Sequence, residues 1–309
     1  QHSEYENIAG TRFADQAMAD RNHGFGGPWT EEKLDRVTRY LQAYTTALKN
    51  QPFQLMYIDA FAGTGYRASK QRGQTVRGFF PLPQMTELAK GSARRALEVD
   101  PPFDRYIFIE ANPGRFQELN KLEGEFPSMR GRMMFKNEEA NAAISEICST
   151  TDWRRTRAVL FLDPYGMQVN WATIEAIGRA QHIDLWYLFP AGTVQRLLQR
   201  EGKISAGWMN ALDRLLGDTS WRTEFYKTVR EPTLFGDRAR QSKVADLSTI
   251  ENYVRRRLLQ VFRGGVARNP LPLRNSKGNC MYLLFFACGN PAPKAHGLAL
   301  KIAQHLLKS

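Results

Sequence analysis

Short apolar runs alternate with amphipathic segments along most of this chain. The runs consist mainly of Leu, Ile, Val, Met and aromatic residues, and they occupy positions 57–59, 106–110, 132–137, 159–163 and 182–190. The last run is almost continuously apolar, as expected of a strand buried between two helical layers. Alternating strands and helices are typical of an α/β fold in which a mostly parallel sheet carries helices on both faces.

The segments between these runs place apolar residues at helical spacing. In the first segment Leu34, Val37 and Leu41 recur three or four positions apart, and Thr30 is suited to cap the helix before two glutamates. The predicted helices span 29–49, 92–98, 171–181, 192–200, 208–216, 221–229, 249–262 and 296–307.

The pattern changes toward the C-terminus. Two apolar segments, 265–273 and 279–288, flank the polar turn 274–278, which predicts a terminal antiparallel hairpin. We expect a loosely ordered lead-in at 1–28, a core formed by 29–191 and 246–309, and a helical insertion at 192–245. The part of this insertion up to residue 241 is rich in Arg, Trp and Gly, so it is the candidate for substrate recognition.

A glycine-rich turn follows the first apolar run, where residues 59–65 read Asp-Ala-Phe-Ala-Gly-Thr-Gly. Gly63 and Gly65 allow positive φ and close approach of backbone N–H groups to a ligand. Asp59, at the strand end, can accept hydrogen bonds from an amine or hydroxyl of a nucleotide-like cofactor. Phe61 stands where a phosphate-binding loop has its first glycine, and no Gly-Lys-Ser/Thr follows, so a P-loop is disfavoured. A tight turn that binds no ligand is the alternative.

A second carboxylate ends the fourth apolar run. Asp163 follows that run and is itself followed by Pro164, Tyr165 and Gly166. Because the carboxyl ends of parallel strands open onto one crevice, we expect Asp59 and Asp163 to face the same ligand.

These motifs resemble those of class I S-adenosylmethionine-dependent methyltransferases. The loop form Asp-x-Phe-x-Gly-x-Gly is similar to that of nucleic-acid methyltransferases, and Asp-Pro-Tyr-Gly is similar to the catalytic Asp-Pro-Pro-Tyr of amino-group methyltransferases, with one proline in place of two. The resemblance implies a Rossmann-like class I methyltransferase sheet, S-adenosylmethionine as cofactor, a ribose contact from Glu110 and catalysis by Asp163, Pro164 and Tyr165. The cofactor-binding residues that it implies are Asp59, Ala60, Phe61, Ala62, Gly63, Thr64, Gly65, Glu110, Asn112, Glu139, Asn141 and Asp163.

A closer resemblance covers most of the chain. Residues 29–34, 59–65, 161–167 and 183–190 are similar to the three-Cys-motif partner protein family, a bacterial and phage-associated group. This resemblance implies a three-Cys-motif protein as a partner, and it makes Trp29 and Lys33 candidates for lining the site. The three cysteines of this chain are not that motif.

The interval between Gly65 and Glu110 predicts an insertion, because a ribose-binding acid is expected roughly 20 residues after a cofactor loop. Basic and aromatic residues are interleaved in this interval. Arg67 and Lys70 are therefore candidates for contacting substrate phosphates. An ordinary solvated loop fits the same composition.

The composition limits the kinds of partner and cellular environment that the sequence predicts. A net charge of +12 and a pI near 9.7 attract polyanions, which makes DNA or RNA a natural partner, although charge alone also fits solubility. Three sparse cysteines and no cluster of His or Cys at ligand spacing argue against a disulfide framework and against a metal site. No run approaches the roughly 20 apolar residues of a membrane helix, and the first residues lack a signal-peptide pattern. We therefore expect a cytoplasmic protein that does not enter membranes.

The sequence thus predicts a methyltransferase acting on an amino group of a nucleic-acid base or nucleotide. Asp163 and the Pro164 carbonyl would accept the hydrogens of the amine, and Tyr165 would stack on a base that is flipped out of any duplex. No cysteine near Asp163 could act as the covalent nucleophile of a cytosine-C5 methyltransferase. Two alternatives stay open: a small-molecule or protein acceptor, and a non-catalytic, cofactor-binding subunit of a three-Cys-motif protein.

Overall fold

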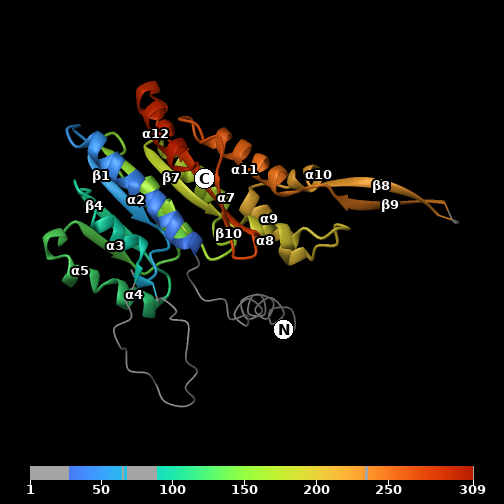
Figure 1. The fold of residues 1–309 in the computed structure, drawn as a ribbon, viewed down its shortest axis with the longest axis horizontal. Coiled ribbons are helices and arrows are strands. Elements are labelled where there is room, and N and C mark those ends of the chain that lie inside the picture. The colour runs from blue at the N-terminus through green and yellow to red at the C-terminus, as the bar shows by residue number, and fades with distance from the viewer. Residues whose placement is uncertain (1–27, 65, 68–88, 234–235, 309) are drawn as a thin grey trace, which may run out of the picture.

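The computed structural model describes residues 28–64, 66–67, 89–233 and 236–308. Its centre is a seven-stranded sheet with the strand order β10-β11-β7-β6-β1-β4-β5 (Figure 1). The strands of this sheet are β1 (Gln54–Asp59), β4 (Arg105–Ile109), β5 (Met133–Lys136), β6 (Thr156–Leu162), β7 (Ile183–Phe189), β10 (Leu271–Arg274) and β11 (Cys280–Cys288).

The strand directions confirm the predicted fold class. Strands β5, β4, β1, β6 and β7 pair in parallel, and β11 is antiparallel to both β7 and β10. From β1 the chain moves outward to β4 and β5 and then returns to the other side of β1 as β6. The strand order therefore reverses at β1, where open α/β sheets form their ligand crevice. The fold is a doubly wound, class I methyltransferase-like sheet with a terminal antiparallel hairpin.

Helices cover both faces of the sheet because side chains on a strand alternate between the two faces. Met56 and Ile58 point into one apolar cluster, which also contains α6, α7 and α11, whereas Leu55 and Tyr57 point into a second cluster with α2, α3 and α12. The helices are α2 (Pro28–Leu48), α3 (Ser92–Leu97), α4 (Pro113–Leu119), α5 (Leu122–Glu125), α6 (Ala140–Thr150), α7 (Trp171–Ala180), α8 (Ala191–Leu197), α9 (Ala206–Leu216), α10 (Trp221–Glu224), α11 (Leu247–Val261) and α12 (Pro293–Leu306).

A buried polar contact fixes α2 against the sheet. The Tyr40 hydroxyl donates a 2.7 Å hydrogen bond to Asp184 of β7. The Tyr40 ring also packs against Trp186 and Phe286, with centroid distances of 5.4 and 4.9 Å. This anchor holds the start of α2 over the carboxyl ends of the strands. Because α2 begins at Pro28, Thr30 lies within its first turn and is not the predicted cap.

The segment before α11 differs from the prediction of a purely helical insertion. The expected helix at 221–229 ends at Glu224, and the chain continues as β8 (Tyr226–Thr233) and β9 (Gly236–Lys243), which pair as an antiparallel hairpin. The helix prediction was wrong because both strands of this hairpin are largely exposed, so neither carries the alternation of apolar residues that marks a half-buried strand. Leu212, Trp221 and Phe225 nevertheless join the apolar cluster of the sheet.

Two other expectations are met only in part. The strand predicted at 265–273 is reduced to β10, preceded by an isolated bridge between Val266 and Ala287. The insertion expected after the glycine turn contains the short antiparallel strands β2 (Tyr66–Arg67) and β3 (Ala89–Lys90), and the residues between them lie outside the described ranges, as does the lead-in at 1–27. Among the described residues, no helix is both long enough and apolar enough to cross a membrane.

Candidate functional site

Three carboxylates converge at the carboxyl edge of the sheet. In the ladder Asp59 lies opposite Phe108 of β4 and Phe161 of β6. Glu110 and Asp163 follow these two partners closely and therefore extend just past Asp59 on either side. All three acids lie at the point where the strand order reverses, and Asp59 and Asp163 meet at one edge as the sequence predicted.

The glycine turn crosses this edge from β6 to β4. The Ala60 N–H donates to the Phe161 carbonyl at 3.1 Å, and the Ala62 N–H donates to the Ile109 carbonyl at 3.0 Å. Gly63 then adopts φ +62°, and a Cβ added there would meet no atom of the described residues within 4 Å. The turn thus leaves open space beside a backbone conformation that side chains with a Cβ avoid. Thr64 is part of the described turn, whereas Gly65 lies outside the described residues.

Asp59 is fully buried below this turn. Its carboxylate accepts from the Phe61 N–H at 3.3 Å and from the Tyr57 hydroxyl at 3.4 Å, and it is also hydrogen-bonded to the Ser92 side chain. Among the described residues, no Lys, Arg or His forms an ion pair with it. Burial, followed by the charge of Asp163, raises the Asp59 pKa to about 7 despite these hydrogen bonds.

We expect the Asp59→Asn variant to be more stable than the wild type at pH 8. The native state holds the Asp59 proton up to about pH 7, whereas the unfolded chain releases it near pH 4. Stability is therefore lost as the pH rises from about 4 to 7, by up to about 4 kcal/mol once Asp59 is ionised. Urea unfolding of the unliganded proteins at pH 5 and pH 8 measures the difference in free energy of unfolding between Asp59→Asn and the wild type. This difference should be smaller at pH 5. Asp35→Asn, on an exposed face of α2, controls for charge removal.

Glu110 is connected to the loop after β6 through Arg115 of α4. The Glu110 Oε1 atom accepts from the Asn112 N–H at 2.8 Å and forms an ion pair with the Arg115 guanidinium at 3.2 Å. The same guanidinium lies 5.1 Å from the centroid of the Tyr165 ring, and its Nε atom makes no hydrogen bond within the described structure. Arg115 therefore extends from the predicted ribose acid to the predicted catalytic loop. Asn112 also caps α4 by accepting from the Arg115 N–H at 3.0 Å.

The two candidates near the end of β5 have hydrogen bonds within the protein. Glu139 caps α6 by accepting from the Ala142 N–H at 3.1 Å. The Asn141 amide donates to Glu139 and to the Gln168 carbonyl, and its oxygen accepts from Asn170 at 2.9 Å. A cofactor contact from the Asn141 side chain would have to replace one of these bonds, whereas the Glu139 carboxylate keeps further acceptor positions.

Asp163 is paired with Lys33. The Lys33 ammonium donates a 2.5 Å hydrogen bond to Asp163 Oδ2, and the side chains of Lys33 and Asp163 are 6% and 22% exposed. Lys33 also lies over the Trp29 ring at 5.3 Å, and Trp29 packs against Tyr282 with a centroid distance of 5.3 Å. The structure therefore brings both predicted residues of α2 to Asp163.

Sequence reasoning missed Tyr282, Arg115 and Ser92. Tyr282 lies near the start of β11, and because β11 runs antiparallel, its first residues reach the same edge as the ends of the parallel strands. Burial, with a further contribution from the Asp163 charge, raises the Tyr282 pKa. The predicted hairpin could have indicated Tyr282, whereas no sequence pattern pairs Arg115 with Tyr165 or Ser92 with Asp59.

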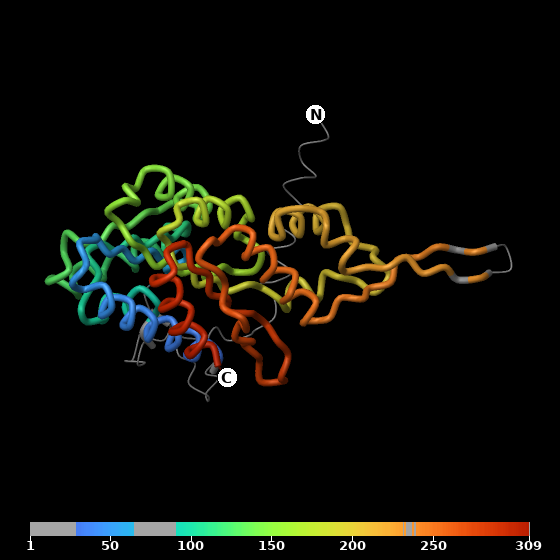
Figure 2. Tube along the Cα trace, turned by 90° about the horizontal axis from the view of Figure 1, so that it is seen from above, coloured from blue at the N-terminus to red at the C-terminus, as the bar shows by residue number. Residues whose placement is uncertain are grey.

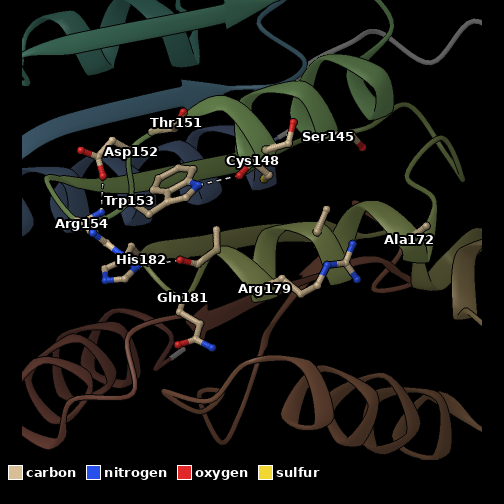
Figure 3. Close-up of a pocket in the computed structure, with 13 residues that line it drawn as sticks. Ser145, Cys148, Thr151, Asp152, Trp153, Arg154, Ala172, Arg179, Gln181 and His182 are labelled. Carbon is tan, nitrogen blue, oxygen red and sulfur yellow. Dashed lines mark hydrogen bonds between the residues drawn. The ribbon is translucent and has the colours of Figure 1, made fainter.

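The remaining candidates and a surface pocket lie away from this cluster or cannot be placed in it. Arg67 belongs to β2, without a described side chain, and Lys70 lies outside the described residues. The pocket in Figure 3 is lined by Cys148, Trp153 and His182, which precede β6 and β7, so it opens at the opposite edge of the sheet. Within the described ranges, no three His, Cys, Asp or Glu side chains are grouped to hold a metal ion.

Comparisons with known proteins give similarity in fold only. No protein-family model and no curated protein matches the sequence. A Legionella pneumophila protein of the family model DUF519 is 15% identical over 92% of this chain and 94% of its own, with a TM-score of 0.43. An S-adenosylmethionine-dependent methyltransferase from Clostridium acetobutylicum is 10% identical over 93% of this chain and 100% of its own, with a TM-score of 0.35. The N-terminal domain of EvdMO1, solved in the presence of SAH and D-fucose, is 12% identical over 87% of this chain and 84% of its own, with a TM-score of 0.35.

At these TM-scores the similarities establish no function, and the fold class follows from the strand order of the chain itself. That order defines a Rossmann-like, class I methyltransferase-like α/β fold. Membership of the three-Cys-motif partner family stays a prediction.

Proposed function

We propose that the protein is an S-adenosylmethionine-dependent methyltransferase. The observation that carries the proposal is Asp59, a fully buried carboxylate beside a left-handed glycine turn at the point where the strand order reverses. No cation among the described residues compensates its charge, and an uncompensated buried carboxylate destabilises a fold. A ligand that carries an ammonium group would offset this cost on binding. The open space at Gly63 fits such a ligand.

Each acid has a role in this proposal. S-adenosylmethionine, when bound, supplies a methyl group activated on a sulfonium sulfur. Asp59 would hold its ammonium group, and Glu110 would accept hydrogen bonds from its ribose in exchange for Arg115, whose side chain is 41% exposed. The complete proposed cofactor set is Asp59, Ala60, Phe61, Ala62, Gly63, Thr64, Gly65, Glu110, Asn112, Glu139, Asn141 and Asp163.

The acceptor would bind at Asp163, because this carboxylate already accepts a hydrogen bond from an amine. The Lys33 ammonium occupies the position that an acceptor N–H group would take, 2.5 Å from Oδ2. An exocyclic amine in that position would also approach the Pro164 carbonyl. Holding such a nitrogen in line with the methyl group is the main contribution that the chain itself makes to methyl transfer.

Aromatic rings near Asp163 favour a flat acceptor. Trp29 and Tyr282 pack together beside Lys33, and Tyr165 is 44% exposed. Such rings stack on bases irrespective of sequence. Together with the net charge of +12, they support a nucleic-acid base or nucleotide as the acceptor, with Trp29, Lys33, Arg67 and Lys70 as proposed substrate contacts.

One observation favours a second candidate function. In the ion pair with Lys33, Asp163 uses an oxygen that catalysis would require. A cofactor-binding subunit that acts only as a partner of a three-Cys-motif protein would tolerate this pairing. A small-molecule or protein acceptor is also compatible with the same cofactor site.

We expect calorimetry to detect binding of S-adenosylmethionine, with higher affinity at pH 8 than at pH 6. The Asp59 pKa of about 7 means that the carboxylate ionises over this range, and the ionised form attracts a cationic ligand. Asp59→Asn should remove most of this pH dependence. If neither S-adenosylmethionine nor S-adenosylhomocysteine gives heat at several hundred micromolar, a level near 5 kcal/mol of binding, the cofactor assignment is wrong.

A further inference from the structure

The hairpin of β8 and β9 forms an arm that extends well beyond the rest of the molecule. The two strands pair at eight consecutive positions, from Tyr226 opposite Lys243 to Thr233 opposite Gly236. Figures 1 and 2, viewed at right angles, both show this arm pointing away from the sheet and its helices. Most of its described side chains are exposed, so the arm contributes little to the apolar core.

The base of the arm is fixed to the main body. The Tyr226 hydroxyl donates to the Gln199 carbonyl at 2.8 Å, and the Lys243 N–H donates to the Arg200 carbonyl at 2.9 Å. The Lys243 ammonium also donates to the Gln195 carbonyl of α8 at 3.1 Å. Helix α8 begins two residues after β7 ends, and β7 pairs with β6, the strand that Asp163 directly follows. The arm is therefore attached to the end of the helix that leaves the carboxyl edge of the sheet, where the candidate site lies.

The described side chains along the outer half of the arm are exposed and mainly polar, with Val229 as an exposed apolar exception. An isolated two-stranded hairpin is at best marginally stable in water. An exposed ribbon of this length thus adds little to folding stability. A role in contacting a partner explains more simply why the chain has this ribbon.

The charge of the arm identifies the chemistry of that partner. Between Tyr226 and Lys243 the sequence has five basic and two acidic residues. Lys227 and Arg230 are exposed and lie three residues apart on β8, an odd spacing that points their side chains to opposite faces of the ribbon. Positive side chains on both faces suit a groove with phosphates along both walls.

We propose that the arm docks into the major groove of double-stranded DNA. That groove is about 12 Å wide and admits a two-stranded ribbon, whereas the major groove of an RNA helix is too narrow for side chains to read. The inference rests on the proposed nucleic-acid acceptor. In that arrangement the arm grips the duplex while the base to be modified is flipped toward Asp163.

The test compares two charge reversals of equal size. Lys227→Glu with Arg230→Glu changes the arm, and Lys294→Glu with Lys301→Glu changes exposed positions of α12, which lies away from the arm in Figure 1. The probe is a labelled DNA duplex of about 20 base pairs, roughly two helical turns, followed by fluorescence anisotropy. We expect the arm variant to bind at least about tenfold more weakly, with the slope of log affinity against log salt reduced by about 2. The α12 variant should retain most of the affinity.

Equal weakening of duplex binding by both variants would overturn the inference, because a general loss of positive charge would then explain the weaker binding. Tighter binding of single-stranded DNA or of an RNA duplex with the same sequence would also overturn it, as would unchanged binding by the arm variant. Calorimetry with S-adenosylmethionine on the same proteins separates the two proposals. If the cofactor binds but the duplex does not, only the arm assignment fails; if the duplex binds through the arm but the cofactor gives no heat, only the proposed methyltransferase fails.

Discussion

Methyl transfer should fall by about 100-fold or more in the Asp163→Ala variant, while affinity for S-adenosylmethionine changes by less than about threefold. The reason is that Asp163 lies at the end of β6, beyond the buried Asp59, and already accepts a hydrogen bond from an amine. Its removal would leave the acceptor nitrogen without a group to orient it. The measurement is transfer of labelled methyl groups to pools of nucleic acid, protein and small molecules, with calorimetry on the same preparations.

Because Asp163 forms an ion pair with Lys33, the Asp163→Ala variant needs a control for lost stability. Asp163→Ala alone leaves the Lys33 ammonium almost fully buried without its carboxylate, and breaking a buried pair costs about 3 to 5 kcal/mol. The double variant Asp163→Ala with Lys33→Met should regain stability but not methyl transfer. Lys33→Met alone should leave the Asp163 carboxylate available to the acceptor amine. Unchanged labelling by Asp163→Ala would show that the chemistry takes place at another strand. A wild-type protein that binds cofactor but labels no pool, even with a three-Cys-motif protein added, would favour the non-catalytic function.

The Gly63→Val variant should bind S-adenosylmethionine at least about 100-fold more weakly. A left-handed conformation costs an ordinary residue roughly 1 to 2 kcal/mol and is still less favourable for a β-branched one. Gly63 has φ +62°, so the turn would have to change its backbone conformation. The added side chain would also enter the open space next to Gly63. Because no atom of the described residues lies within 4 Å of the added Cβ, the expected loss is in ligand binding and not in core packing.

Gly131 offers a matched control. It also has a positive φ, +84°, and open space around an added Cβ, but it precedes β5 at the opposite edge of the sheet. Gly131→Val should therefore lower stability to a similar degree and leave the calorimetric affinity for S-adenosylmethionine unchanged. If the two valine variants bind the cofactor equally well, the turn at Gly63 does not contact it.

The sequence predicted the central strands well because they are buried on both faces. Nearly continuous apolar runs such as 159–162 and 183–189 are typical of strands buried between two helical layers, and their lengths suit strands better than helices. The same pattern failed for 221–229, where Trp221 and Phe225 are four residues apart as on a helix. Both side chains are indeed buried, but the chain between Tyr226 and Lys243 pairs with itself in solvent. Such pairing leaves almost no trace in the distribution of apolar residues.

The sequence by itself determined the α/β class, the terminal hairpin and the convergence of Asp59, Glu110 and Asp163, because each acid directly follows an apolar strand and parallel strands end at one edge. Only the tertiary structure decided which groups these acids meet. Lys33 on α2 reaches Asp163 because Tyr40 anchors that helix to β7, and Tyr282 joins it because β11 runs in the opposite direction. The raised pKa of Asp59 likewise depends on burial and on Asp163 more than 100 residues away along the chain. Side chains separated by such distances in sequence meet through the packing of whole helices and strands, and local patterns do not record that packing.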